Sequence, residues 1–283
     1  MKFKPDALLM TVSRERLLLL FLCGGLPLFL HAQTAGSISA GTRSVAMGGV
    51  RATLTDIGAA WGNQAGLAHV EAFTAAVQAE RRFGLAELQS IGAAAALPTG
   101  SGVWGLTLHS FGFELYSEQR AGLAYGRKLT DNFSLGAQML LFNHRIEEYG
   151  SRLTFSFELG LMAELSPKLS FGVHAANPMR VEVAPGENLP TVFRLGFNYR
   201  PSGQIALLAE VEKDIEFGPR VKTGIDYRLV DALALRIGVA TEPTEITFGA
   251  GYRVNTALAV DVSAAYHQIL GFTPAVGVVY TGK

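Results

Sequence analysis

The sequence is poor in several features that are common in soluble proteins. Cys23 is its single cysteine, so the rest of the chain has no disulfide framework. Charged residues make up 17% of the chain, below the roughly 25% that is usual for soluble domains. The mean hydropathy is nevertheless positive at +0.25, although no run after residue 33 approaches the roughly 20 apolar residues that a membrane helix needs. Apolar residues are therefore spread over many short segments, as alternating strands would spread them.

The chain also lacks the residue patterns of catalytic and metal sites. His109 and Ser110 are adjacent in a predicted strand, so their side chains point to opposite faces and cannot act as a pair. His144, His174 and His267 stand alone, without the spacing of metal ligands, and no glycine-rich stretch matches a phosphate-binding loop. We therefore expect no enzymatic activity, no cofactor and no metal, the alternative being a Ser/His/Asp set assembled from distant residues inside a barrel. A net charge of zero gives no indication of nucleic-acid binding.

Residues 1–32 have the pattern of a secretory signal peptide. An interrupted apolar core follows a basic start, and Ala32 stands at a plausible cleavage site. A retained membrane anchor is the alternative, but Gly24, Gly25 and Pro27 interrupt the apolar segment. We expect three parts: the signal peptide, an N-terminal segment over 33–70, and a strand region over 71–283.

The strand region repeats a period of two. In the stretch 220–228, Val221, Thr223, Ile225 and Tyr227 lie on one face and charged residues lie on the other. An apolar face that recurs in strand after strand is typical of a barrel surrounded by lipid. We predict an all-β fold, a transmembrane antiparallel β-barrel of about 14 strands, with a soluble two-sheet protein as the alternative and twelve strands as the other possible count. The predicted strands are 71–82, 88–98, 102–112, 117–128, 133–146, 152–164, 168–177, 191–200, 203–213, 219–229, 232–240, 244–253, 256–267 and 272–281.

The connections between these segments alternate between tight polar turns and longer loops. Bacterial barrels place short turns on the periplasmic side, so an even strand number puts both termini in the periplasm. The longest loop is 177–190, and a charged loop covers 212–219. A tyrosine closely followed by an arginine precedes four of the tight turns, and these tyrosines are predicted to form a periplasmic aromatic girdle. They are Tyr125, Tyr199, Tyr227 and Tyr252.

The inward rows carry charges of both signs in near balance, which favours ion pairs over an ion-selective pore. The predicted lumen charges are Glu80, Arg120, Glu158, Arg194, Glu210, Lys222, Asp226, Arg236, Glu245 and Asp261. Glycine is concentrated on the same rows, where it marks either a close neighbour in the lumen or relief of strain in the curved sheet. If a neighbour is the reason, the segment 34–69 is the candidate plug.

This N-terminal segment is rich in Gly, Ala, Ser and Thr, and we predict a short helix that begins after Thr53 or Thr55 and ends near Gly62. Its motif resembles that of the FadL-like outer-membrane superfamily, which includes fatty-acid transporters and the PorV/PorQ family of type IX secretion. The matching residues include Gly41, Arg43, Met47, Gly48, Gly49, Asp56, Asn63, Gly66 and Leu67. Gln64 departs from the family pattern, which has proline at this position.

The resemblance implies an outer-membrane barrel of fourteen strands with a hatch inside it. Because only the loop 177–190 has any length, we expect a non-enzymatic PorV/PorQ-type accessory or shuttle component of protein secretion, with a FadL-like channel for hydrophobic molecules such as long-chain fatty acids as the alternative. We expect a monomeric barrel in contact with outer-membrane lipid, with secretion proteins or a hydrophobic ligand as further partners. Inside it, Arg43 or Arg51 is expected to face carboxylates such as Glu158, Glu210 or Asp261.

Overall fold

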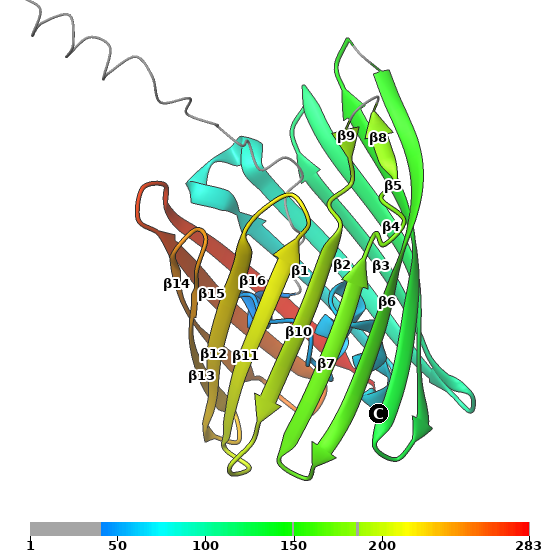
Figure 1. The fold of residues 1–283 in the computed structure, drawn as a ribbon. Helices are drawn as coiled ribbons and strands as arrows, with labels where there is room; N and C mark the ends of the chain where they lie inside the picture. The colour runs from blue at the N-terminus through cyan, green and yellow to red at the C-terminus, as the bar shows by residue number, and fades with distance from the viewer. Residues whose placement is uncertain (1–40, 149, 185–186, 283) are drawn as a thin grey trace, which may run out of the picture. The chain divides into compact units, whose positions relative to one another are not determined.

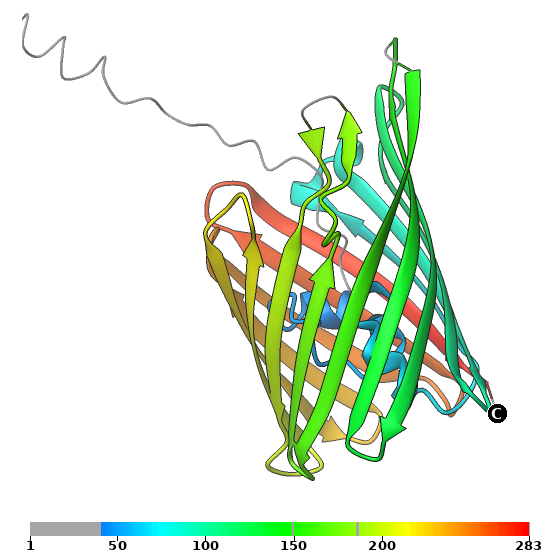
Figure 2. The same ribbon diagram turned by 45° about the vertical axis from the view of Figure 1, so that its right-hand side comes forward.

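The computed structural model describes residues 41–148, 150–184 and 187–282, so the predicted signal peptide and its cleavage site near Ala32 lie outside the described residues. The described chain forms one closed antiparallel β-barrel around the segment 41–70, which we call the plug (Figure 1, Figure 2). Neighbouring strands pair in chain order, β7 pairs with β10, and β1 closes the barrel against β16. The barrel has fourteen strands, as predicted.

The barrel strands are β1 (Thr74–Arg81), β2 (Gln89–Thr99), β3 (Gly102–Gly112), β4 (Tyr116–Thr130), β5 (Phe133–Ile146), β6 (Gly150–Ser166), β7 (Leu169–Ala176), β10 (Val192–Tyr199), β11 (Ile205–Asp214), β12 (Pro219–Val230), β13 (Leu233–Ala240), β14 (Glu245–Arg253), β15 (Leu258–His267) and β16 (Gly271–Thr281). Each corresponds to one predicted segment, including the alanine-rich second strand. The loop between β7 and β10 contains a small sheet that the sequence did not predict, formed by β8 (Glu182–Ala184) and β9 (Glu187–Asn188).

The period of two explains why these segments form a membrane barrel. Along β12, the outward Val221 and Ile225 are 44% and 42% exposed, whereas the inward Lys222 is 2% exposed. A soluble protein would bury the aliphatic side chains and expose the lysine. The reversed pattern fits hydrocarbon outside and a polar, filled lumen inside.

The plug begins with the α-helix α2 (Thr42–Val45) and continues with two 3₁₀ helices, η1 (Ile57–Trp61) and η2 (Gln64–His69). The sequence predicted η1 but not its cap: the side chain of Asp56 accepts a hydrogen bond from the Gly58 amide at 2.9 Å. The predicted caps, Thr53 and Thr55, are therefore wrong, because the carboxylate stands directly before the first turn. Two further 3₁₀ helices, η3 (Arg82–Gly84) and η4 (Ala86–Leu88), lie between β1 and β2. None of the described helices has the length and apolar character needed to cross a membrane.

The strands differ in length, and this makes the wall uneven at the end that carries the longer loops. Strand β6 has 17 residues, whereas β7 and β10 have 8 each. The first residues of β6, up to Phe157, therefore pair with β5 but not with β7. The β8–β9 sheet lies against this part of β6. We call this end of the barrel the loop end and the opposite end, with the tight turns, the turn end.

Candidate functional site

The plug follows the inner wall closely because the wall is glycine-rich where the two meet. A Cβ atom at Gly136 would overlap with the backbone of Gln64 and Ala65, and one at Gly172 would overlap with Ala52. Nine of the eleven glycines that the sequence places on the inward rows lie against plug atoms: Gly105, Gly136, Gly160, Gly172, Gly196, Gly224, Gly238, Gly249 and Gly277. The other two, Gly92 and Gly122, lie against wall side chains. Of the two explanations for these glycines, the structure therefore supports a close neighbour in the lumen.

A tight turn after α2 brings the plug against β12 and β13. Gly48 and Gly49 have φ values of 74° and 75°, in the left-handed region that glycine tolerates best. A Cβ at Gly48 would lie 2.7 Å from the carbonyl oxygen of Thr223 and 2.8 Å from that of Val239. The double glycine of the motif thus allows both the turn and the close contact with the wall.

Arg43 links the plug to the wall near the turn end. Its Nη2 donates to Oδ2 of Asp226 at 2.7 Å and its Nε donates to the same oxygen at 3.1 Å, while Asp56 pairs with its Nη1. Oδ1 of Asp226 also forms an ion pair with Nε of Arg236 at 3.3 Å, and Arg236 pairs with Asp261. Arg43 or Arg51 was expected to face lumenal carboxylates such as Glu158, Glu210 or Asp261. Arg43 faces a lumenal carboxylate outside these three, whereas Arg51 lies near Glu210 and Glu158. The position of the plug relative to β12 selects Asp226.

Glu210 holds the middle of the plug through the backbone. Its Oε2 accepts hydrogen bonds from the amides of Arg51 and Ala52, both at 2.7 Å. Its other oxygen lies 3.5 Å from Nζ of Lys222, which also pairs with Glu212 at 2.7 Å. Burial and, to a smaller extent, the positive charge of Arg194 together lower the pKa of the Arg51 guanidinium to about 10, against the opposing effect of nearby glutamates.

Two amide side chains anchor η2. Asn63 caps the helix, with its Oδ1 accepting from the Ala65 amide, and donates to the carbonyl oxygen of Leu161 in β6 at 2.9 Å. Gln64 donates to Gln138 at 2.8 Å and to Glu158 at 2.7 Å. The departure from the family pattern at Gln64 therefore supplies two side-chain contacts with the wall that a proline lacks.

The ten predicted lumen charges all lie on inward rows, and each takes part in an ion pair. Glu80 pairs with Arg82, Arg120 with Glu118, Arg194 with Glu212, and Glu245 with Arg220. Glu158 lies 3.3 Å from His174. The partners Glu118, Glu212 and Arg220 were not singled out from the sequence, although alternation along their strands places them on the same face.

The predicted girdle tyrosines lie on outward rows at the turn end. Tyr199, Tyr227 and Tyr252 are exposed at the barrel surface. Tyr125 is half-buried because its ring packs on Trp104, with 4.8 Å between ring centroids. Trp104 was missed in the sequence, although its place in the β3 alternation would have added it to this outward row.

An aromatic cluster, which we call the loop-end cluster, lines the lumen on the loop side of the plug. It consists of Phe111, Tyr116, Phe142, His144, Val183 and Leu189. The ring centroids of Tyr116 and His144 are 5.0 Å apart, and the guanidinium of Arg120 lies over the Phe142 ring at 4.8 Å. The sequence analysis named His144 as an isolated histidine, but its position beside the β7–β10 loop depends on how that loop folds.

The β7–β10 loop reaches the loop-end cluster because Asn177 holds its two ends together. The Asn177 side chain accepts from the Val181 amide at 3.0 Å and donates to the Leu189 carbonyl at 2.7 Å. Its backbone carbonyl accepts from the hydroxyl of Thr191 at 2.9 Å. These contacts place Val183 and Leu189 against Phe142.

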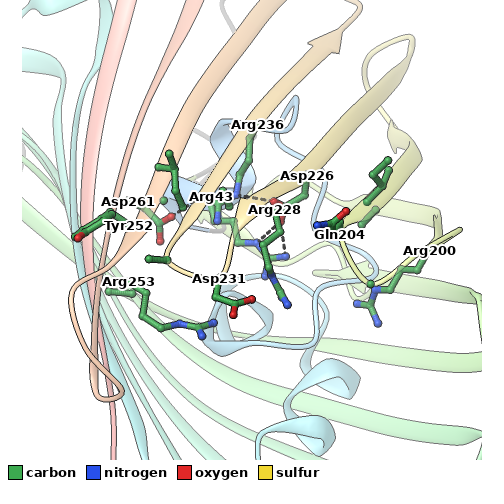
Figure 3. A pocket seen from close by; sticks show the side chains of 18 of the residues that line it. Arg43, Arg200, Gln204, Asp226, Arg228, Asp231, Arg236, Tyr252, Arg253 and Asp261 are labelled. Atoms are coloured by element: carbon green, nitrogen blue, oxygen red, sulfur yellow. Dashed lines mark hydrogen bonds and ion pairs between the residues drawn. The ribbon is translucent and has the colours of Figure 1, made fainter.

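On the turn side of the plug lies a cavity of about 480 Å³, which we call the turn-end pocket (Figure 3). Arg43 from the plug contributes to its lining, together with residues at the ends of β10 to β15 and in their turns. Its charged lining residues are Arg43, Arg200, Asp226, Arg228, Asp231, Arg236, Arg253 and Asp261.

Comparison with known proteins shows which fold this is. No protein-family model and no curated protein matches the sequence. Among solved structures, the chain is similar to the CymD monoaromatic hydrocarbon channel, with a TM-score of 0.67, 13% identity, and coverage of 87% of this chain and 98% of that one. It is also similar to the Ralstonia pickettii toluene transporter TbuX (TM-score 0.65, 12% identity, 84% and 96% coverage) and to a Pseudomonas aeruginosa FadL homologue (0.63, 13%, 85% and 98%).

These three neighbours are described as a channel, a transporter and a FadL homologue, in agreement with the expectation of a non-enzymatic barrel in the bacterial outer membrane. They lend no support to the PorV/PorQ side of the resemblance. The chain has the fold of the FadL-like outer-membrane barrels.

Proposed function

We propose that the protein is an outer-membrane channel, acting as a monomer, through which small hydrophobic molecules pass. This is the alternative drawn from the sequence, and we prefer it to the PorV/PorQ-type secretion role expected first. The observation that carries the proposal is the loop-end cluster, because it presents buried aromatic and aliphatic side chains to the lumen on the outer side of the plug. The hydrocarbon and toluene transport named for two of the structural neighbours supports it.

The loop-end cluster has the chemistry of a weak site for an apolar ligand. A single-ring molecule that buries roughly 150 Å² of apolar surface gains about 4 kcal/mol at ~25 cal/mol per Å². That free energy corresponds to a dissociation constant on the order of 1 mM. A site of this affinity concentrates a dilute hydrophobic molecule at the loop end and still allows it to dissociate.

A molecule bound at the loop-end cluster must pass the plug to reach the turn end. The strand pairing of the described barrel is continuous around its circumference, and plug residues such as Met47 and Leu67 are fully buried against the wall. A molecule that travels from the loop end to the turn end therefore requires a displacement of part of the plug. The plug is held by hydrogen bonds and ion pairs and also by an apolar cluster that joins Met47 and Leu67 to wall residues such as Leu208. Its displacement therefore exposes apolar as well as polar side chains to the passing molecule.

Uptake of toluene into vesicles with a lipopolysaccharide outer leaflet tests the proposal. We expect the wild-type barrel to accelerate uptake, Phe142→Ala to lower the barrel-dependent rate about five- to ten-fold, and Phe155→Ala to leave it within about two-fold. Phe155 is the matched control because it lies on neighbouring β6 but faces outward and is 62% exposed. Uptake no faster than in barrel-free vesicles would refute the channel. Co-purification of secretion proteins from gently solubilised membranes would then favour the secretion role.

A further inference from the structure

The turn-end pocket has a charge pattern that the passage of a hydrophobic molecule does not explain. Five arginines line it against three aspartates. Two of the arginines are neutralised: Arg43 by Asp226 and Asp56, and Arg236 by Asp226 and Asp261. The excess positive charge therefore belongs to the remaining three.

These three arginines are Arg200, Arg228 and Arg253. Across residues 41–148, 150–184 and 187–282, their side chains form no hydrogen bond or ion pair, and Asp231 is the one lining carboxylate left without an ion pair. Figure 3 shows all three around the same mouth, with Asp231 between Arg228 and Arg253. The unpaired groups sum to two positive charges, and the ion-paired groups, with Asp56 included, sum to one negative charge, so the pocket has a net charge of +1.

Their placement follows from a repeat in the sequence. Each arginine comes directly after a girdle tyrosine, in the pairs Tyr199–Arg200, Tyr227–Arg228 and Tyr252–Arg253. Adjacent residues of a strand face opposite sides, so a tyrosine that faces lipid directs the next residue to the lumen. In the fourth case Gly126 stands between Tyr125 and Arg127, so Arg127 faces outward and does not line the pocket. The Tyr-Arg pairs on β10, β12 and β14 thus build a half-ring of guanidinium groups.

Guanidinium groups recognise carboxylates and phosphates through paired N–H donors and remain charged at any physiological pH. Desolvation and then the neighbouring guanidinium of Arg43 lower the pKa of Arg200, against the opposing effect of nearby carboxylates. A cavity of about 480 Å³ is within the range of small-molecule sites. Arg200, Arg228 and Arg253 are exposed, so their guanidinium groups are accessible to a ligand from solution.

We propose that the turn-end pocket is a binding site for an oxyanion, a carboxylate or phosphate group, presented from the periplasmic side and held by Arg200, Arg228 and Arg253. The site goes beyond the proposed channel, because it needs only the half-ring of arginines and no hydrophobic passenger. The same chemistry has two sources, a free small anion or the headgroup of a lipid in the inner leaflet. The inward direction of the three side chains favours the free anion.

The test is calorimetric titration of the full-length barrel, in a neutral detergent at low ionic strength, with inorganic phosphate, benzoate and uncharged benzyl alcohol. We expect at least one of the two anions to bind and benzyl alcohol not to bind in this pocket. The triple variant R200Q/R228Q/R253Q should weaken anion binding at least ten-fold. The control R145Q/R152Q/R180Q removes three exposed arginines that do not line the pocket. It should change the affinity for the anion less than two-fold.

The possible outcomes distinguish a free anion from a lipid headgroup and define the results that would contradict the proposal. Anion binding that phosphatidylglycerol nanodiscs suppress, relative to phosphatidylcholine nanodiscs, would assign the site to a lipid headgroup, and binding that is equal in both would assign it to a free anion. Absence of binding by both anions, or equal losses in the two triple variants, would overturn the proposal. Thermal unfolding of both variants checks that the fold is intact. Toluene uptake by the R200Q/R228Q/R253Q variant tests the anion site and the channel separately. If the anion site and the channel are independent, this variant takes up toluene as the wild type does.

Discussion

The two ends of the lumen have opposite chemistry. The loop-end cluster is aromatic and aliphatic, and the charges beside it, Arg120 and Glu118, are paired with each other. The turn-end pocket has eight charged residues in its lining, and three of its arginines have no ion-pair partner among the described residues. Between them lies the plug, which contacts glycines on most of the strands. The comparison indicates that the barrier to passage through the lumen is the close contact between plug and wall. The two ends of the lumen offer a passing molecule different environments.

If this fit is the barrier, enlarging one wall glycine under the plug has the largest effect. Gly136→Val forces side-chain atoms into the backbone of Gln64 and Ala65. We expect about 3 kcal/mol of destabilisation, the upper part of the usual range for overpacking, measured by urea unfolding in lipid vesicles. The control is Gly218→Val, because no atom lies within 4 Å of a Cβ at that loop position. Equal stability of the two variants would show that the plug does not occupy this place.

The connection between the plug and the turn-end pocket is tested by Asp226→Asn. The substitution removes the carboxylate that Arg43 and Arg236 share and leaves Arg236, which is largely buried, with Asp261 alone. We expect a loss of about 2 kcal/mol, less than for a fully buried pair because Arg43 is partly exposed. Planar-bilayer recordings should show more frequent opening events. Asp231→Asn is the control in the same pocket. Similar recordings from both variants would show that the pairing of Arg43 with Asp226 does not keep the plug closed.

A smaller effect is expected from Gln64→Pro, which restores the residue of the family pattern. Proline fits the first position of η2, and the preceding Asn63 is extended (φ −95°, ψ 105°), as a residue before proline prefers. The cost is therefore the loss of the side-chain hydrogen bonds to Gln138 and Glu158, about 1 kcal/mol. Hydrogen exchange should rise over the plug and remain unchanged in the strands. An increase in the strands as well would show that the residue shapes the barrel itself.

The sequence predicted the barrel more completely than the site, and the reason is physical. A period of two assigns each side chain to lipid or lumen without knowledge of its neighbours, so the strand number, the inward charges and the inward glycines follow directly. The partners inside the lumen depend on the position of the plug along the wall, which no periodicity encodes. Arg43 meets Asp226 for this reason rather than Glu158, Glu210 or Asp261. The loop-end cluster was not predictable either, because Val183 and Leu189 reach Phe142 only through the Asn177 contacts.

The measurement that tests the account most directly is uptake through a barrel whose plug is fixed covalently. A Cβ at Gly277 would lie 3.2 Å from Cβ of Thr42, close to the roughly 3.5–4.5 Å of a disulfide, and Cys23, in the predicted signal peptide, is the single native cysteine. The variant T42C/G277C should therefore link the plug to β16 on oxidation. The account predicts that oxidation lowers barrel-dependent toluene uptake at least five-fold and that a reductant restores it. Formation of the disulfide with unchanged uptake would contradict passage by displacement of the plug.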